Sequence, residues 1–282
     1  MEYITFGPVH LNVTNLNKSI EFWINVVGMQ VRKEGNPTEI GTSERTLIML
    51  HPDAETPYKK GYSSIYHLAI HLPSESELAR LLLRLMKSGW KISPVDHIIA
   101  KSIYANDPDG ISIEFAFETP ERVRSYEIME DGLKVIDNEG RLKSPVEALD
   151  VQSVLNHLTD YNTNHPFPNE TIVGHMNLHV GNLQTAYDFY KKLGFTEHFN
   201  FPQFGWGDLG AGGIVDHRIA VNTWAGVNAP KALAGAAGLK YFTLKYDSKE
   251  LLSKVLGNIP NTVEYNEGYL VEDPAGNKIM LS

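Results

Sequence analysis

The sequence of 282 residues contains no cysteine, no long apolar run and no excess of basic residues. The absence of cysteine excludes disulfides, thiolate metal ligands and a cysteine nucleophile. No apolar stretch approaches the ~20 residues that span a bilayer, and the N-terminus lacks the basic-then-apolar order of a signal peptide. We therefore expect a cytoplasmic protein without a membrane partner. The formal net charge of −9 argues against nucleic acid as a partner.

Two stretches in the two halves of the chain follow the same pattern, in which a strand with alternating apolar residues leads into a short helix. Five residues of the first half match five of the second at a constant offset: Leu11, Val13, Asn15, Leu16 and Phe22 match Leu178, Val180, Asn182, Leu183 and Phe189. Four more matches lie near the end of each half: Asp107, Pro108, Gly110 and Ile113 match Asp273, Pro274, Gly276 and Ile279. The chain therefore contains an internal repeat.

The repeat predicts an α+β fold made of four βαβββ modules. One module cannot bury its concave face alone, so we expect the modules to pair into two cupped mixed sheets around a cavity. Residues 1–120 are assigned to an N-terminal pair of modules, 121–170 to a connector with one helix, and 171–282 to a C-terminal pair. Asn17 is expected to cap the first helix. Ser144 is expected to cap the connector helix, with Glu147 closing a capping box.

Three polar side chains occupy repeat positions at which the other modules have different residues. His67 opens the first strand of the second module, Glu114 lies in the last strand of that module, and His175 opens the first strand of the third. Two histidines and one carboxylate leave one face of an octahedral ion open, an arrangement typical of non-haem Fe(II) or Mn(II) sites. Such a site requires the second and third modules to share one barrel.

The modules and their motifs resemble the vicinal oxygen chelate superfamily, which includes glyoxalase I, bleomycin resistance proteins and extradiol ring-cleaving dioxygenases. The resemblance covers nearly the whole chain. It rests on Gly-His-x-x-Leu-x-Val-x-Asn-Leu from Gly174, Asp-Pro-x-Gly-x-x-Ile-Glu from Asp107, and the run from Asp216 to Trp224. The motifs are most similar to those of catechol 2,3-dioxygenase-type proteins. The resemblance implies the glyoxalase/bleomycin resistance/dioxygenase fold, Fe(II) or alternatively Mn(II) at the three residues, and a small catechol-like aromatic and O2 as substrates.

The resemblance also implies roles for three further residues. His217 matches the histidine that moves protons for the bound catecholate and oxygen, Tyr104 matches the active-site tyrosine, and His97 resembles a further pocket histidine. The chain departs from the family in one respect. In many two-domain extradiol dioxygenases the metal set lies wholly in the C-terminal half, where this chain has Tyr241 and Met280 at two of the three positions. The site must therefore use both halves.

Two other functions stay open at this point. A glyoxalase-type lyase or isomerase would hold Ni(II) or Zn(II) with four ligands, including His217, and would use no oxygen. A metal-free protein of the bleomycin-resistance kind would bind an aromatic drug in the same cavity. Oxygen consumption separates the first two functions, and bound metal separates both from the third. The sequence does not decide the ring substituents, the cleavage position or whether the chain forms a homo-oligomer.

Overall fold

Four modules with the order strand, helix and three strands follow one another in the computed structural model, which describes residues 2–130, 132–266 and 268–282. The first comprises β1 (Ile4–Asn12), α1 (Leu16–Glu21) continued by the π-helix η1 (Phe22–Val27), β2 (Gln30–Lys33), β3 (Thr38–Gly41) and β4 (Thr46–His51). The second comprises β5 (Ile65–His71), α2 (Glu75–Ser88), β6 (Ile92–Asp96), β7 (Ala100–Asn106) and β8 (Ser112–Glu118).

The second half of the chain repeats this order. The third module comprises β13 (Ile172–His179), α4 (Leu183–Lys192), β14 (Thr196–Phe201), the 3-10 helix η3 (Pro202–Phe204), β15 (Trp206–Gly210) and β16 (Ile219–Asn222). The fourth comprises β17 (Gly238–Tyr246), α5 (Lys249–Asn258), β18 (Val263–Tyr265), β19 (Gly268–Glu272) and β20 (Lys278–Leu281). The predicted α+β fold of βαβββ modules is confirmed.

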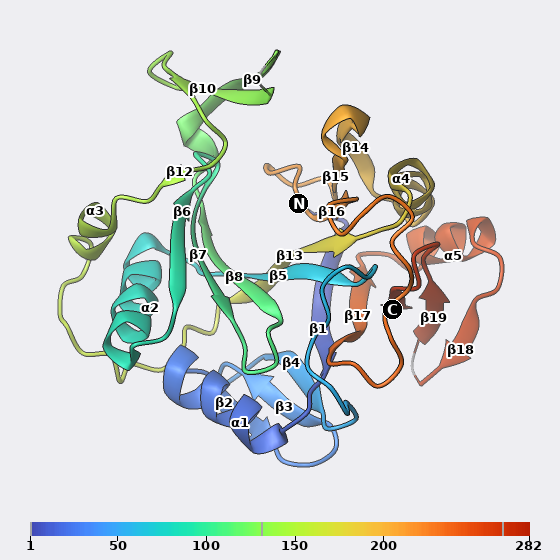
Figure 1. The fold of residues 1–282 in the computed structure, drawn as a ribbon, viewed down its shortest axis with the longest axis horizontal. Coiled ribbons are helices and arrows are strands. Elements are labelled where there is room, and N and C mark those ends of the chain that lie inside the picture. Colours follow the sequence, from blue (N-terminus) through green and yellow to red (C-terminus); the bar gives the residue numbers. More distant parts are fainter. Residues whose placement is uncertain (1, 131, 267) are drawn as a thin grey trace.

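The modules pair through their first strands, which run antiparallel to each other. β1 pairs with β17 in an eight-stranded sheet of order β18-β19-β20-β17-β1-β4-β3-β2. β5 pairs with β13 in a nine-stranded sheet of order β12-β6-β7-β8-β5-β13-β16-β15-β14. The first module therefore shares a sheet with the fourth, and the second with the third (Figure 1). The second of these pairings is the one that a site built from His67, Glu114 and His175 requires.

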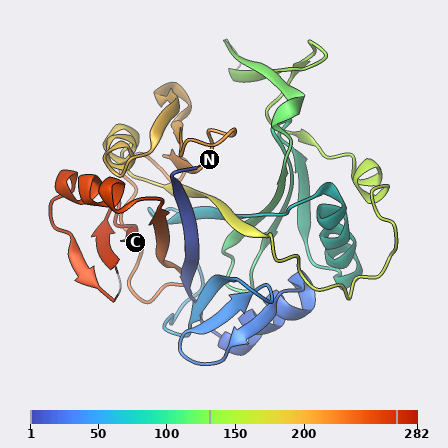
Figure 2. The same ribbon diagram turned by 180° about the vertical axis from the view of Figure 1, so that it is seen from behind.

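The module helices lie on the outer sides of the two sheets, as the view from behind also shows (Figure 2). Helix α2 begins at the cap Ser74, whose Oγ accepts the N–H of Glu77, and it buries Leu78 and Leu82 in the core. Burial of such apolar stripes is the main force that stabilises the modules. None of the helices in the described ranges is long and apolar enough to cross a membrane.

The connector forms several short elements. They are the 3-10 helix η2 (Pro120–Arg122), β9 (Val123–Met129), β10 (Gly132–Asp137), β11 (Leu142–Lys143), β12 (Glu147–Ala148) and α3 (Val151–Leu155). Strands β9, β10 and β11 make a separate three-stranded sheet, and β9 and β10 project at the top of Figure 1. Strand β12 extends the nine-stranded sheet next to β6.

The connector helix does not begin where the sequence indicated, so the prediction of a cap at Ser144 is wrong. One bond of the expected capping box forms, since Glu147 Oε1 accepts the Ser144 N–H at 3.2 Å, but Ser144 Oγ accepts the N–H of Val146 in place of that of Glu147. Glu147 nevertheless belongs to β12 and pairs with Asp96. Hydrogen bonds to the open edge of β6 satisfy this backbone in place of a helix. The helix starts after Asp150, whose Oδ1 accepts the Ser153 N–H.

The cap of the first helix is also shifted, from the predicted Asn17 to Asn15. Asn15 Oδ1 accepts the Lys18 N–H at 3.1 Å. Its repeat counterpart Asn182 accepts the Thr185 N–H in the same way. The repeat itself thus marks the residue that caps both helices.

Candidate metal centre

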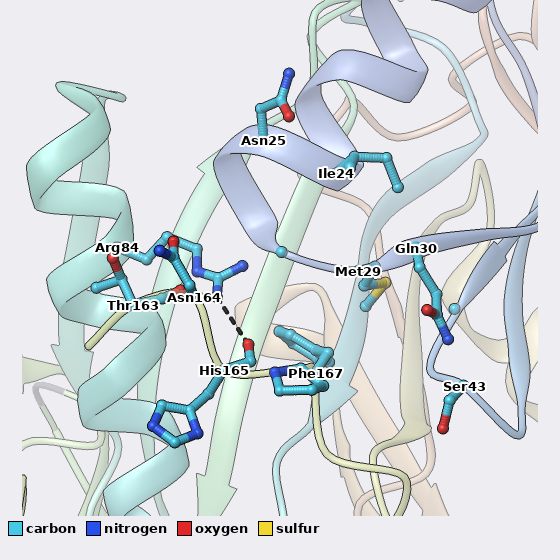
Figure 3. A pocket seen from close by; sticks show the side chains of 13 residues that line it. Ile24, Asn25, Met29, Gln30, Ser43, Arg84, Thr163, Asn164, His165 and Phe167 are labelled. Carbon is cyan, nitrogen blue, oxygen red and sulfur yellow. Dashed lines mark hydrogen bonds between the residues drawn. The ribbon is translucent and has the colours of Figure 1, made fainter. Parts of the chain in front are cut away.

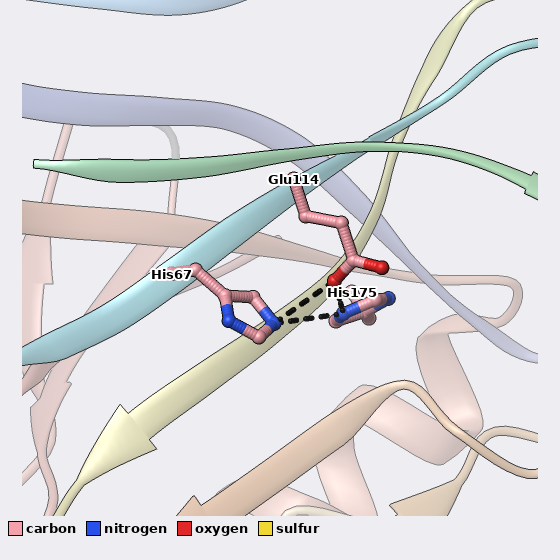
Figure 4. A group of neighbouring side chains, drawn as sticks. All are labelled: His67, Glu114 and His175. Carbon is pink, nitrogen blue, oxygen red and sulfur yellow. Dashed lines mark hydrogen bonds and ion pairs between the residues drawn. The ribbon is translucent and has the colours of Figure 1, made fainter. Parts of the chain in front are cut away.

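His67, Glu114 and His175 meet at the seam between the second and third modules (Figure 4). They come from β5, β8 and β13, which are neighbours in the order β8-β5-β13. Ala69 of β5 pairs with both Glu114 and His175, and Asn177 of β13 pairs with His67. All three polar side chains are buried. The strand register thus brings into one group three residues that lie between 47 and 108 positions apart in the sequence.

The donor atoms of the three side chains form a nearly equilateral triangle. His67 Nε2 lies 3.1 Å from Glu114 Oε2 and 3.1 Å from His175 Nε2, and His175 Nε2 lies 3.2 Å from Glu114 Oε2. Donors about 2.0–2.2 Å from an ion lie about 2.8–3.1 Å apart on neighbouring corners of an octahedron and about 3.3–3.6 Å apart on a tetrahedron. The observed spacing is that of donors around one divalent ion and is closest to an octahedral face.

The surroundings favour the protonation states that metal ligands need. Burial lowers the pKa of His175 well below its ordinary value, so the imidazole is neutral. Burial alone would raise the pKa of Glu114, but the imidazoles of His175 and His67 outweigh it and lower this pKa well below its usual range. Glu114 Oε1 also accepts the hydroxyl of buried Ser102 at 2.6 Å. The group is thus an ionised carboxylate beside the neutral imidazole of His175.

The strand register also locates the position at which a fourth protein ligand would stand. Glu114 lies on β8 beside Ala69, and Ala69 is the residue opposite His175. In the third module, the residue equivalent to Ala69 is Asn177 of β13, which lies opposite His67. The residue of β16 that pairs with Asn177 is Ala220, so Ala220 is equivalent to Glu114. A methyl group cannot bind a metal ion. The group therefore offers three candidate donors and leaves the fourth equivalent position without one.

His217 lies next to the triad, with its ring centre 4.5 Å from that of His175. Its Nδ1–H donates to Asp208 Oδ2 at 2.8 Å, and the same oxygen accepts His198 Nδ1–H at 3.2 Å. Asp208 is buried, and the two histidines outweigh the effect of that burial and lower the pKa of Asp208. The carboxylate is therefore ionised and fixes His217 with Nε2 as the nitrogen that can accept a proton.

Tyr104 and His97 form a second pair on the other side of the triad. The Tyr104 ring lies 5.5 Å from the His67 ring, and its hydroxyl lies 2.9 Å from His97 Nε2. His97 Nδ1 lies 2.8 Å from the carbonyl of Pro145, which can only accept. His97 therefore carries its proton on Nδ1 and accepts the Tyr104 hydroxyl at Nε2. Burial and the nearby Glu114 raise the pKa of Tyr104 well above its ordinary value, which keeps the hydroxyl protonated.

All six residues singled out from the sequence therefore lie in one region, but four other members of that region were missed. They are Ser102, Asp208 and a pair behind His175, His71 and Glu118. No repeat match or family motif singles out these residues. A usable signal was the equal spacing, because His71 and Glu118 each follow a triad residue by four positions and so lie on the same face of the strand.

A cavity of about 440 Å³ lies elsewhere, between η1, β2 and residues 163–167 (Figure 3). None of the six residues lines it. Its charged lining residue, Arg84, donates to the carbonyls of Val27 at 3.4 Å and His165 at 3.0 Å. Arg84 therefore ties the connector to the first two modules.

Comparison with known proteins agrees with this architecture. The sequence profile of the Glyoxalase/Bleomycin resistance protein/Dioxygenase superfamily matches residues 5–115. The chain belongs to this superfamily. A relative that is similar over nearly the whole chain is the catechol-2,3-dioxygenase of Bacillus subtilis (strain 168), with 32% identity over 272 residues, which are 95% of this chain and 90% of that protein.

Two solved structures share the fold at low sequence identity. A Bacillus subtilis protein considered a candidate dioxygenase superposes with a TM-score of 0.61 at 10% identity, covering 98% of this chain and 84% of that one. Glyoxalase I from Zea mays superposes with a TM-score of 0.55 at 14% identity, covering 99% of this chain and 92% of that one. Members with different reactions thus share this architecture, so the reaction must be argued from the site.

Proposed function

We propose that this protein is an extradiol dioxygenase, which opens the ring of a catechol-like aromatic with O2. We assign His67, Glu114 and His175 as the ligands of a divalent metal ion, Fe(II) or alternatively Mn(II). A metal ion bound there supplies open positions for the two adjacent oxygens of a catechol and for dioxygen. The full-length similarity to a catechol-2,3-dioxygenase supports this proposal.

The observation that carries the proposal is the triangle of donors with edges of 3.1, 3.1 and 3.2 Å beside a fourth position occupied by Ala220. This set matches the octahedral face used by non-haem Fe(II) oxygenases. A lyase or isomerase of the glyoxalase type would need a fourth protein ligand, but the equivalent position holds Ala220, and the described donor atoms that lie within 4.8 Å of one another are those of His67, Glu114 and His175 without His217. A drug-binding protein would gain nothing from a buried carboxylate between two imidazoles, because burying a charge is costly.

Two residues are assigned to the protons of the substrate. His217 acts as the base, because Asp208 leaves its Nε2 ready to take a phenolic proton. Tyr104 directs its only proton to His97, so the lone pairs of its hydroxyl oxygen can accept a hydrogen bond from a catechol hydroxyl. The two residues lie next to different triad histidines, His175 and His67. A catechol placed between them would lose its second phenolic proton to His217.

The test is oxygen uptake recorded together with visible absorbance, after anaerobic loading with Fe(II), on adding catechol or a substituted catechol. We expect one O2 consumed per catechol and a yellow ring-opened product. Glu114→Ala should lose both signals and bind the metal more than about 100-fold more weakly, since even partners of ligands contribute about 10–100-fold. Glu127→Gln, which alters an exposed carboxylate of β9, is the matched control and should retain both. Tight metal binding without oxygen uptake would overturn the assignment as a dioxygenase.

A further inference from the structure

His71 lies directly behind one of the triad histidines. It is buried in β5, four residues after His67, and its Nε2 lies 3.1 Å from His175 Nδ1. Its other nitrogen, Nδ1, lies 3.4 Å from Glu118 Oε1. Glu118 in turn follows Glu114 by four residues on β8. The two strands that supply triad residues therefore also supply the two groups behind them.

Glu118 is held in place by a buried arginine. Arg218 donates from Nη1 to Glu118 Oε1 at 2.7 Å and from Nη2 to Oε2 at 3.3 Å, and it also binds Glu2. Only 6% of Arg218 is exposed, so this paired guanidinium cannot move into solvent without losing both carboxylates. The contacts run without interruption from His175 through His71 and Glu118 to Arg218.

These contacts permit only one arrangement of protons when the centre holds a metal ion. A histidine ligand must present a nitrogen without a proton, and His175 faces the triad with Nε2. His175 therefore carries its proton on Nδ1 and donates it to His71 Nε2. His71 must then carry its own proton on Nδ1, which faces the Glu118 carboxylate. By contrast, the buried Nδ1 of His67 has no hydrogen-bond partner among the residues that the structure describes.

The residue before His175 leaves the space that His71 needs. A Cβ atom on Gly174 would lie 2.1 Å from Cγ and Cδ2 of His71, well inside contact distance. Gly174 is therefore explained by the close approach of the His71 ring to β13 rather than by backbone conformation.

We infer that His71, held by Glu118 and Arg218, is a positioning residue that fixes the tautomer and ring orientation of His175 and so raises the affinity of the centre for its metal ion. The inference rests on the proposed function in taking the triad as the metal ligands. It assigns no contact with substrate to His71. It also makes the two histidine ligands unequal, because His175 is oriented through its outer nitrogen and His67 is not.

The test compares the metal affinities of full-length variants. The metal-free protein is titrated anaerobically with Fe(II) or Mn(II) against a competing chelator. We expect His71→Phe to weaken binding about 10–100-fold. His71→Gln should recover part of this loss, because the amide oxygen can accept the His175 proton near the position of Nε2. The control is His10→Phe, which breaks a buried histidine pair in the other sheet, His10–His51 at 2.9 Å, and should leave the affinity unchanged.

A second readout separates positioning from a general loss of structure. With diamagnetic Zn(II) bound as a probe, the Nδ1–H proton of His175 should give a downfield, slowly exchanging NMR signal in the wild type, because it is hydrogen-bonded to His71. In folded His71→Phe this signal should move upfield and exchange faster. Unchanged affinity and an unchanged Nδ1–H signal in this variant would overturn the inference. If His71→Phe does not fold, Glu118→Gln replaces it. That variant should bind metal several-fold more weakly, and wild-type affinity would likewise overturn the inference.

The inference and the proposed function fail in different ways. Wild-type protein that binds metal but consumes no oxygen with any catechol contradicts the proposed reaction and leaves the role of His71 standing. Active wild-type protein with unaltered metal affinity in the His71 and Glu118 variants contradicts only the inference. Wild-type protein that binds no metal contradicts both.

Discussion

Asp208 Oδ2 lies 2.8 Å from His217 Nδ1 and fixes which nitrogen of that histidine is free to accept a proton. The carboxylate is buried, and it also accepts the Phe199 N–H through its other oxygen at 3.0 Å. Asp208 therefore cannot rotate away without leaving the partly buried Phe199 N–H unpaired. The orientation of the proposed base depends on a residue that does not belong to the triad.

Asp208→Asn should lower kcat/KM for catechol about 100-fold, which is within the usual contribution of a general base. The amide keeps the shape of the carboxylate, but its NH2 group can face His217 Nδ1 and stabilise the wrong tautomer. Metal affinity should stay at the wild-type value, because Asp208 binds none of the triad residues. Steady-state kinetics and a metal titration measure the two effects.

His198→Gln is the matched control for this prediction. It removes the other histidine on the same carboxylate, whose Nδ1 lies 3.2 Å from Asp208, and should change kcat/KM only slightly. Equal losses in the two variants would mean that Asp208 acts by holding the local structure and not by orienting His217.

Ala220 offers a way to change the reaction class. It is fully buried on β16 at the position equivalent to Glu114. In Ala220→Glu we expect the new carboxylate to act as a fourth ligand, so that Zn(II) or Ni(II) binds at least as tightly as in the wild type. Oxygen uptake with catechol should be lost, because an open position is filled. Metal titration and oxygen uptake measure these two properties.

Ala220→Gln has a similar size and no charge, and it serves as the control. The metal-free glutamate variant should be less stable than the glutamine variant, because its carboxylate is buried without an opposite charge. Added metal should raise the melting temperature of the glutamate variant by the larger amount. Wild-type oxygen uptake in Ala220→Glu would show that position 220 does not face the centre.

The modules and the triad were predictable because the chain repeats itself. Matches such as Leu11 with Leu178 reveal the repeat without any contact being known. The requirement that His67 and Glu114 meet His175 then selected the pairing of the second module with the third. Local patterns could not have selected it, because each first strand presents a similar apolar pattern and pairing depends on contacts more than 100 residues apart.

The contacts of the residues behind the triad could not be predicted, and the reason is physical. His71 and His175 lie 104 residues apart, and their hydrogen bond depends on the register of β5 against β13. The prediction of a helix start at Ser144 failed in the opposite way, since one local capping bond forms but Glu147 pairs with the edge of β6 as part of a strand. Tertiary contacts decide which of these local structures forms, and the local pattern of a single sequence does not reveal those contacts.

Gly174→Ala should weaken metal binding through His71. The new methyl group would lie 2.1 Å from the His71 ring, so the ring must move away from His175. We expect metal affinity to fall about 10-fold and the free energy of unfolding to fall by about 1–3 kcal/mol through overpacking. Metal titration and urea unfolding measure the two effects.

Gly257→Ala is the control for the added methyl group. A Cβ at Gly257 in α5 meets no atom within 4 Å, so alanine should stabilise the helix by about 0.5–1 kcal/mol and leave metal affinity unchanged. Wild-type metal affinity in Gly174→Ala would contradict the close packing of His71 against β13.

The two Asp-Pro turns of the repeat differ in how well their aspartates are paired. Asp107 Oδ1 accepts the N–H groups of Asp109 and Ile111, but its buried Oδ2 has no hydrogen-bond partner in the part of the chain that the structure describes. Asp273 Oδ2 accepts both the Tyr190 hydroxyl and the Asn277 amide at 2.9 Å. Asp107 is thus a buried carboxyl group with an incomplete set of donors.

This difference predicts a pH dependence of stability. Burial raises the pKa of Asp107 from 3.8 to about 7, so between about pH 4 and pH 7 the folded protein keeps a proton that the unfolded chain has lost. The free energy of unfolding should therefore fall as the pH rises through this window, by about 1.4 kcal/mol per pH unit from this group. Asp107→Asn should remove that slope, and the variant should be more stable than the wild type at pH 8. Urea unfolding between pH 5 and pH 8 would measure both effects. Asp273→Asn is the matched variant: burial also raises the pKa of Asp273, but the Tyr190 hydroxyl and the Asn277 amide oppose that effect, and the substitution should cost about 1–3 kcal/mol because it disturbs these hydrogen bonds. Equal destabilisation by the two substitutions at pH 8 would contradict the assignment of Asp107 as the poorly paired member of the repeat.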